Sequence, residues 1–377
     1  MFKNAIDVFK IFGFWIKIDP SWFVIVALIV WSLSTAYFPD ALPGYTRAGY
    51  ILLSILAALG LFGSLILHEL SHSLAARRFG VKIAGITLFI FGGVAELEKE
   101  PANAKSEFWI AIAGPVMSLF LGGVALVISS AIESSGLSRA GAVLFSYLGL
   151  INLVLAIFNM VPAFPLDGGR ILRAALWAYR GDLIWATRIA STAGSIFGYA
   201  LVFSGLWALF SGVTVGGLWQ ILIGMFVLSA SKGTYRHLVT KEALKDQTVR
   251  ALMTQQSWMA SPTDTLDHVV NDIMLGHNVS FVPVLDSDRL LGYVDTALAQ
   301  KIGREEWAGT PIGDVYVPAS DANTIPPDTP MQALMDKITK TGQRKFLVSD
   351  GNALLGVITL ADLTTYLAIS QGFSRTR

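Results

Sequence analysis

The sequence contains no cysteine. Disulfide bonds and thiolate metal sites are therefore excluded, and any bound metal ion must use histidine, aspartate or glutamate as ligands. Histidine is also scarce, with five in 377 residues. Two of these five stand four residues apart between Leu67 and Ser73, so this stretch is the first place to look for a metal site.

Charged residues are few as well. Asp, Glu, Lys and Arg make up 15% of the chain, whereas hydrophobic residues make up 53%. This excess of apolar residues predicts a protein embedded in a lipid bilayer. More than half of the charged residues follow Thr240, which indicates an apolar part followed by a soluble part of ordinary composition. The net charge of +1 argues against binding to nucleic acid.

Six apolar runs are predicted to be membrane-spanning helices. They cover about residues 22–37, 51–70, 108–132, 140–161, 189–210 and 215–230. No small-residue cleavage pattern follows the first run, so we expect a retained span and not a signal peptide. With a cytoplasmic N-terminus, fourteen basic residues lie inside and only Arg47 and Arg139 lie outside. Both termini are therefore expected in the cytoplasm, and the membrane is expected to be the inner membrane of a prokaryote.

Two shorter stretches have a different character. Residues 4–17 alternate polar and aromatic side chains, which predicts an amphipathic or strand-like segment on the membrane surface. Residues 81–94 are apolar, but they are too short and too rich in β-branched residues and glycine for a span. We expect strands there, with a bend at Gly92-Gly93.

The stretch Leu67 to Ser73 reads Leu-His-Glu-Leu-Ser-His-Ser at the end of the second apolar run. His68 and His72 are four residues apart, so on a helix their imidazoles share one face and can bind one metal ion. Glu69 can accept a proton from a water molecule on that metal. The alternative is a hydrogen-bonded cluster at a helix end, which leaves three polar groups buried in an apolar segment at high cost. The pattern favours a zinc hydrolase.

A catalytic zinc usually has three protein ligands and one open position. The extended signature with a third histidine six residues further on is absent, because Arg78 stands there. The remaining histidines lie in or next to the soluble part, and we interpret them as ordinary surface or core residues: His237, His268 and His277. A carboxylate is therefore expected as the third ligand.

Asp167 is the best candidate for this carboxylate. It follows two prolines that unwind the inner end of the fourth span, and Gly168-Gly169 allow close backbone approach. On residues alone the alternative stays open that Asp167 caps a helix beginning near Gly169. Four other carboxylates are less suitable, two on the outer side and two in a polar inner stretch: Asp40 and Glu133, and Glu96 and Glu98.

Residues Asn159 to Arg170 read Asn-Met-Val-Pro-Ala-Phe-Pro-Leu-Asp-Gly-Gly-Arg. Together with His-Glu-Leu-Ser-His inside one span, this segment resembles the site-2 proteases, the intramembrane zinc metalloproteases of peptidase family M50. The resemblance covers about residues 1–236. It implies that His68, His72 and Asp167 bind one zinc ion and that Glu69 is the catalytic base.

The same resemblance implies a place for the substrate, a transmembrane protein. Asn159 matches a residue that contacts the substrate or the oxyanion, with a helix-end cap as the alternative. Pro165 matches a position near the substrate cleft. Phe91, Gly92 and Gly93 match a membrane-inserted β-segment with which an extended substrate pairs.

The soluble part contains two similar halves. Gly292 and Gly356 occupy equivalent positions 64 residues apart, and Thr248 and Thr310 lie 62 residues apart. This pattern resembles a tandem pair of CBS domains, which form one cytoplasmic module and often bind adenine nucleotides.

The two repeats differ at the residues that contact nucleotide in this family. In the second repeat, Thr359 and Asp362 match the contacts to phosphate and ribose, which implies a half-site for ATP, ADP or AMP. In the first repeat, Asp295 replaces Ser or Thr and repels phosphate. The alternative is a ligand-free structural or dimerisation module, in which Thr359 and Asp362 cap the last helix and two chains form a homodimer.

The expected fold is a polytopic α-helical membrane protein with six transmembrane helices, a short membrane-associated β-segment and a cytoplasmic α/β CBS pair. The expected boundaries are 1–236 for the protease domain, 237–247 for a linker, and 248–308 and 309–377 for the CBS domains. The expected function is zinc-dependent cleavage of a transmembrane protein near the cytoplasmic face (regulated intramembrane proteolysis), with access modulated by the CBS pair. The alternative is a CBS-regulated transporter or channel, but the spans contain no internal repeat and no second acidic cluster.

Overall fold

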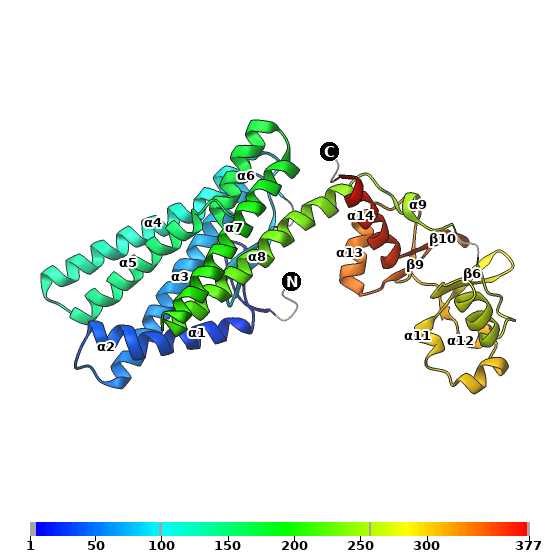
Figure 1. Cartoon of the computed structure of the whole chain (residues 1–377), viewed down its shortest axis with the longest axis horizontal. Coiled ribbons are helices and arrows are strands. Elements are labelled where there is room, and N and C mark those ends of the chain that lie inside the picture. The colour runs from blue at the N-terminus through cyan, green and yellow to red at the C-terminus, as the bar shows by residue number, and fades with distance from the viewer. Residues whose placement is uncertain (1–4, 98–99, 256–257, 375–377) are drawn as a thin grey trace. The chain divides into compact units, whose positions relative to one another are not determined.

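The computed structural model describes residues 5–97, 100–255 and 258–374. The chain forms two compact units, Met1–Arg236 and His237–Arg377, and each is described by itself. The first unit is a bundle of long helices with a small sheet, and the second is an α/β module (Figure 1).

Among the described residues, five helical segments are long and apolar enough to cross a membrane. The first comprises α1 (Ser21–Ser32), the π-helical η1 (Leu33–Tyr37) and α2 (Phe38–Ala41). The others are α3 (Arg47–Arg78), α4 (Ala104–Ser135), α5 (Arg139–Asn159) and α7 (Leu183–Phe210). They coincide with the first five predicted spans. The sixth lies in α8 (Thr214–Ala243), which carries Gln220, Lys232 and Arg236 and does not belong to this set.

Close backbone contacts at glycines bring neighbouring helices together. A Cβ atom on Gly122 of α4 or on Gly149 of α5 would meet the backbone of the other glycine. Between α7 and α8 the same holds where Gly198 meets Gly224 and where Gly205 meets Gly217. Small residues at such crossings are typical of helix packing in membranes, where close van der Waals contact drives association. The short helix α6 (Asp167–Arg180) packs against α4 and α7.

A four-stranded sheet lies against the helix that carries the histidines. Its order is β1 (Ile6–Ile11), β2 (Phe14–Ile18), β3 (Ile83–Phe89) and β4 (Gly92–Leu97), with β2 and β3 parallel and the other pairs antiparallel. Phe14, Ile16 and Ile86 pack on Leu70 of α3. Both predicted β-segments are therefore strands of one sheet. β4 lies at an edge of that sheet.

The second unit contains two related α/β halves. The first half comprises α9 (Val249–Leu252), α10 (Leu266–His268), the π-helical η2 (Val269–Leu275), β5 (Phe281–Asp286), β6 (Arg289–Asp295), α11 (Thr296–Ala299), the 3-10 helix η3 (Arg304–Gly309), α12 (Ile312–Val315) and β7 (Val317–Pro318). The second comprises β8 (Thr324–Ile325), α13 (Met331–Thr341), β9 (Lys345–Asp350), β10 (Ala353–Thr359) and α14 (Leu360–Ser374). The sheet orders are β5-β6-β7 and β10-β9-β8.

The two halves share one apolar core. Phe281, Leu290 and Tyr293 of the first sheet pack against Leu347 and Val357 of the second. The start of the first repeat also crosses over, because Thr254 forms a bridge with Val357. The two repeats therefore form one structural module and not two independent domains.

Candidate metal centre

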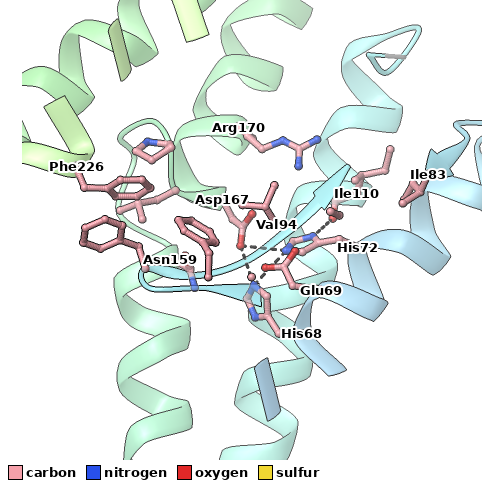
Figure 2. Close-up of a pocket in the computed structure, with 16 residues that line it drawn as sticks. His68, Glu69, His72, Ile83, Val94, Ile110, Asn159, Asp167, Arg170 and Phe226 are labelled. Carbon is pink, nitrogen blue, oxygen red and sulfur yellow. Dashed lines mark hydrogen bonds and ion pairs between the residues drawn. The ribbon is translucent and has the colours of Figure 1, made fainter. Parts of the chain in front are cut away.

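Three side chains from two helices converge in the membrane unit. His68 and His72 lie on one face of α3, and Asp167 is the first residue of α6. The Oδ2 atom of Asp167 is 3.2 Å from Nε2 of each histidine, and the two Nε2 atoms are 3.2 Å apart. Figure 2 shows the carboxylate directed at both rings. All three side chains are buried.

This triangle has the dimensions of one face of a tetrahedral zinc site. With zinc–ligand bonds of about 2.0–2.1 Å, tetrahedral ligand atoms lie roughly 3.3 Å apart. Two imidazoles and one carboxylate are a ligand set of catalytic zinc enzymes, which leaves a fourth position open. The donor set and its spacing therefore fit zinc.

Helix α4 fixes both imidazole rings from behind. The Nδ1–H group of His72 donates to the carbonyl oxygen of Ile110 over 2.6 Å, and Nδ1 of His68 lies 2.8 Å from Oγ of Ser118. A carbonyl can only accept, so Nε2 of His72 keeps its lone pair for a metal. In the same tautomer, the Nδ1–H group of His68 donates to Oγ of Ser118, and Nε2 of His68 also keeps its lone pair. Such partners orient metal ligands and raise their basicity.

A glycine of α4 leaves room for the metal. A Cβ atom on Gly114 would collide with the Nε2 atoms of His68 and His72. Any side chain at this position would therefore occupy the space between the two ligand atoms.

The position of Asp167 depends on packing around the start of α6. Gly168 and Gly169 contact the backbone of residues 160–164 so closely that a Cβ atom would not fit. Arg173 donates through Nε and Nη2 to Oε1 of Glu107, joining α6 to α4, and its guanidinium lies over the ring of Phe164. This ion pair is buried.

The expected role of Asp167 as a metal ligand was set against an alternative, which was to cap a helix near Gly169. The alternative role as a cap of a helix near Gly169 does not apply, because α6 begins at Asp167 itself and Leu166 is the N-cap residue. The N-cap forms no side-chain hydrogen bond. Tertiary packing of the two glycines overrides their low helix propensity and starts the helix two residues early.

The three ligand candidates border a pocket of about 230 Å³, which Glu69, Asn159 and Pro165 also line (Figure 2). Phe91 and Gly93 contribute from the β3–β4 hairpin. The turn of this hairpin is at Ile90 and Phe91, and Gly92, where the bend was predicted, is already the first residue of β4, with φ of 135°. The side chain of Asn159 makes no hydrogen bond with any residue that the structure describes, so a helix-end cap is not seen. Phe226 of α8 stacks on Phe91 with centroids 4.4 Å apart, at the side of the pocket.

Other candidates lie elsewhere. Thr359 and Asp362 are in the second unit, where Oδ2 of Asp362 accepts from both N and Oγ1 of Thr359 at 2.8 Å. His268 pairs with Asp272, and His277 stacks on Trp258. Within the described residues, Asp40 and Glu133 do not join the cluster. Glu98 lies outside the described residues, and the side chain of Glu96 is not described.

Sequence reasoning missed the contribution of α4. Ser118, Gly114 and the carbonyl of Ile110 lie in a long apolar helix, where small residues are common. The one available signal was the Gly114-Pro115 pair in mid-helix, since the proline leaves the carbonyl of Ala111 without its helical donor and so disturbs the turn that contains Ile110. Arg170 and Phe226 also line the pocket, but no pattern in the sequence assigned a role to either side chain.

A buried His₂Asp set with a neighbouring glutamate, inside a bundle of apolar helices, defines a membrane-embedded metallohydrolase. The sequence profile of peptidase family M50 matches residues 56–140 and 134–204, and that of the CBS domain matches residues 249–296 and 312–369. The chain belongs to peptidase family M50, the site-2 protease family, and is an integral membrane zinc metalloendopeptidase with a CBS pair.

Two relatives, from Mycobacterium tuberculosis and Methanocaldococcus jannaschii, agree with this assignment. Rip3 of Mycobacterium tuberculosis is 34% identical over 372 residues, which cover 97% of this chain and 94% of that protein. The zinc metalloprotease MJ0392 of Methanocaldococcus jannaschii is 31% identical over 311 residues, covering 82% of this chain and 84% of that protein. A solved site-2 protease from the same archaeon is 32% identical, covers 61% of this chain and 94% of its own, and superposes with a TM-score of 0.46. The resemblance seen in the sequence is confirmed, and membership favours a protease over a transporter.

Proposed function

We propose that this protein cleaves a transmembrane protein substrate near the cytoplasmic face of the membrane, with His68, His72 and Asp167 holding one zinc ion. The observation that carries the proposal is the equal 3.2 Å spacing of the three buried ligand atoms, beside a pocket that Glu69 lines. Bound zinc supplies Lewis-acid activation of water and of the scissile carbonyl.

Glu69 is the proton carrier in this mechanism. Its carboxylate faces the pocket, and no hydrogen bond ties it to any residue in the described part of the chain. It is therefore free to take a proton from the attacking water and to pass it to the leaving amine. A Cβ atom on Gly93 of β4 would lie 2.8 Å from Cγ of Glu69, so the hairpin lies beside this side chain.

Edge strand β4 is the proposed docking place for the substrate. Helical carbonyls of a substrate are already hydrogen-bonded, so the segment to be cleaved must unwind first. Pairing of the unwound segment with β4 keeps its backbone satisfied in a low-dielectric setting. Phe91, Gly93 and Val94 of the hairpin line the pocket, so a strand added at this edge runs past Glu69. Asn159 and Pro165 border the same path.

The first test replaces the base. Glu69→Gln is expected to lower cleavage of a co-reconstituted membrane substrate by roughly 10²- to 10⁴-fold, because an amide cannot accept the proton. Zinc content, measured by mass spectrometry of the purified protein, should stay at one per chain. Glu133→Gln, a matched change at an exposed glutamate remote from the cluster, should leave the rate unchanged. Undiminished cleavage by the Glu69→Gln variant would rule out the mechanism.

We further infer that α8 is the sixth span and that both termini are cytoplasmic. The glycine contacts of α8 with α7, at Gly217 and Gly224, are of the kind that pack helices in membranes. An even number of spans returns the chain to the side of its N-terminus. The excess of basic residues on that side supports a cytoplasmic location in a prokaryotic inner membrane.

Regulation by the CBS pair is proposed through α8. This helix carries Phe226, which stacks on Phe91 beside the pocket. One residue beyond its end, Leu244 belongs to the buried core of the second CBS repeat, with Ile325 and Leu334. We propose that a change within that core reaches the membrane unit through α8, which continues from one unit into the other. A ligand, or pairing of two chains as a homodimer, would supply such a change.

The nucleotide version of this proposal has a direct test. Thr359 and Asp362 hydrogen-bond each other as an N-terminal cap of α14, and Asp295 of the first repeat pairs with Lys345 at 3.0 Å. If ATP, ADP or AMP binds at Thr359 and Asp362 of the second repeat, calorimetry on the full chain should show saturable heat for one site. The Asp362→Ala variant should show no such heat. The exposed Asp336→Ala is the control. Absence of heat with all three nucleotides would rule out regulation by a nucleotide. Pairing of two chains through the CBS domains would then remain as the proposed means of regulation.

A further inference from the structure

Arg170 is the one arginine of α6 that forms no ion pair or ring contact in the described part of the chain, although its charge acts on the nearby carboxylate of Glu69. Arg173 pairs with Glu107, and Arg180 lies over the ring of Trp185. The guanidinium of Arg170 forms no hydrogen bond, ion pair or ring contact with the residues described. Arg170 is half-buried, lines the pocket, and follows Asp167 by one turn.

Because Arg170 is half-buried, a guanidinium without a hydrogen-bond acceptor is energetically unfavourable there. A guanidinium that is partly removed from water loses hydration, and a protein usually restores this loss with a carboxylate or a hydrogen-bond acceptor. Figure 2 shows Arg170 on the opposite side of the Asp167 carboxylate from Asn159. The pocket therefore has a neutral amide on one side of the ligand cluster and an unpaired cation on the other.

The reaction itself creates an anion in this pocket. Water adds to the peptide carbonyl, the C–N bond breaks, and Glu69 carries one water proton to the leaving nitrogen. The carboxylic acid that results passes its proton, which is the second proton of the water, to the new amine, so cleavage inside a bilayer yields one carboxylate and one ammonium group. Both are expensive in a low-dielectric setting unless they are paired. The planar fork of a guanidinium matches a carboxylate with two parallel hydrogen bonds.

We propose that Arg170 binds the new C-terminal carboxylate of the product. It would be the first side chain to bind this carboxylate when the product leaves the metal. The inference rests on the proposed proteolytic function and gives Arg170 a role in product binding. An acidic side chain of the substrate has the same chemistry, and the test below separates the two sources.

The experiment uses the full chain with the Glu69→Gln substitution, loaded with zinc, so that binding is measured without turnover. The probe is an N-terminally labelled apolar hexapeptide, made as a free acid and as a C-terminal amide. The ratio of their dissociation constants reports recognition of the terminal carboxylate. Adding Arg170→Gln is expected to reduce this ratio about tenfold to hundredfold, the range for a charge-assisted hydrogen-bond pair. Zinc content should not change.

Three controls separate a specific role from a structural one. Arg170→Lys keeps the charge and should retain part of the preference for the acid. Arg180→Gln, on the exposed part of the same helix, should leave the ratio unchanged. A second pair of C-terminally amidated peptides differs only in an internal glutamate or glutamine. The ratio of their dissociation constants should be the same for the protein with Arg170 as for the Arg170→Gln variant.

Several results would overturn the proposal. They are an unchanged acid-to-amide ratio in Arg170→Gln, an equal weakening of acid and amide, loss of zinc, or a preference for the internal glutamate. Failure of the proposed function is distinguishable from all of these, because it would show as continued cleavage by Glu69→Gln alone.

Discussion

Gly114→Ala is expected to abolish zinc binding and proteolysis together. The added methyl group would collide with Nε2 of His68 and of His72, the two atoms that face the metal. The rings cannot turn away freely, because their Nδ1 atoms are held by Ser118 and by the carbonyl of Ile110 on the same helix. Helix α4 would therefore push the ligand atoms apart while still holding the rings from behind.

Helix stability does not explain such a loss. Replacing glycine by alanine inside a helix is favourable by about 1 kcal/mol in intrinsic propensity. Gly123→Ala is the matched control, because it lies on the same helix with no heavy atom within 4 Å of the added Cβ. Zinc content and cleavage rate of both variants give the measurement. A Gly114→Ala protein with one zinc per chain and a normal rate would show that the centre is less rigid than its hydrogen bonds indicate.

Arg173→Met is expected to lower the free energy of unfolding by about 3–5 kcal/mol, the usual cost of breaking one partner out of a buried ion pair. Glu107 is fully buried, and its Oε2 atom already has no hydrogen-bond partner among the described residues. Loss of Arg173 would leave the entire carboxylate unpaired. Because the pair joins α6 to α4, Asp167 should also move away from the histidines and zinc affinity should fall.

The double variant Glu107→Leu, Arg173→Met distinguishes the ion pair from the packing around it. Replacing both partners by apolar side chains of similar volume removes the uncompensated charge and is often neutral. We therefore expect most of the stability to return, as measured by denaturation in detergent micelles. Arg180→Met, at an exposed position of α6, should cost less than about 1 kcal/mol. A double variant as unstable as Arg173→Met would mean that the cost lies in packing and not in charge.

The three side chains proposed as metal ligands could be predicted from sequence, because the histidine pair has a local signature and the segment around Asp167 resembles that of the site-2 proteases. His68 and His72 are four residues apart on a helix, and Asp167 follows a proline-broken helix end. The support from α4 was not readable, because Gly114 and Ser118 acquire their roles only from how α4 is rotated against α3. That rotation is set by tertiary packing, and an apolar helix carries no local mark of it.

The CBS pair shows the same limit. The sequence indicated that Asp295 would repel phosphate, but it gave no sign of the Lys345 side chain that pairs with it. Lys345 lies 50 residues away in the other repeat, so the pairing depends on how the two sheets share their core. The presence of two similar α/β halves followed from the repeated pattern.

In the membrane unit, the start of α6 did not follow from the sequence, because contacts with residues 160–164 decide it.

The separation of the ligands along the chain also sets the order in which the protease matures. Asp167 follows His72 by 95 residues and His68 by 99. A ribosome makes the two histidines first and the aspartate only after α4 and α5, so a chain under synthesis carries an incomplete coordination set. Long-range contacts of this kind form late, after the local helices. The proposed metal site is therefore complete only after the last of the three residues has been made and the helix bundle has closed around it.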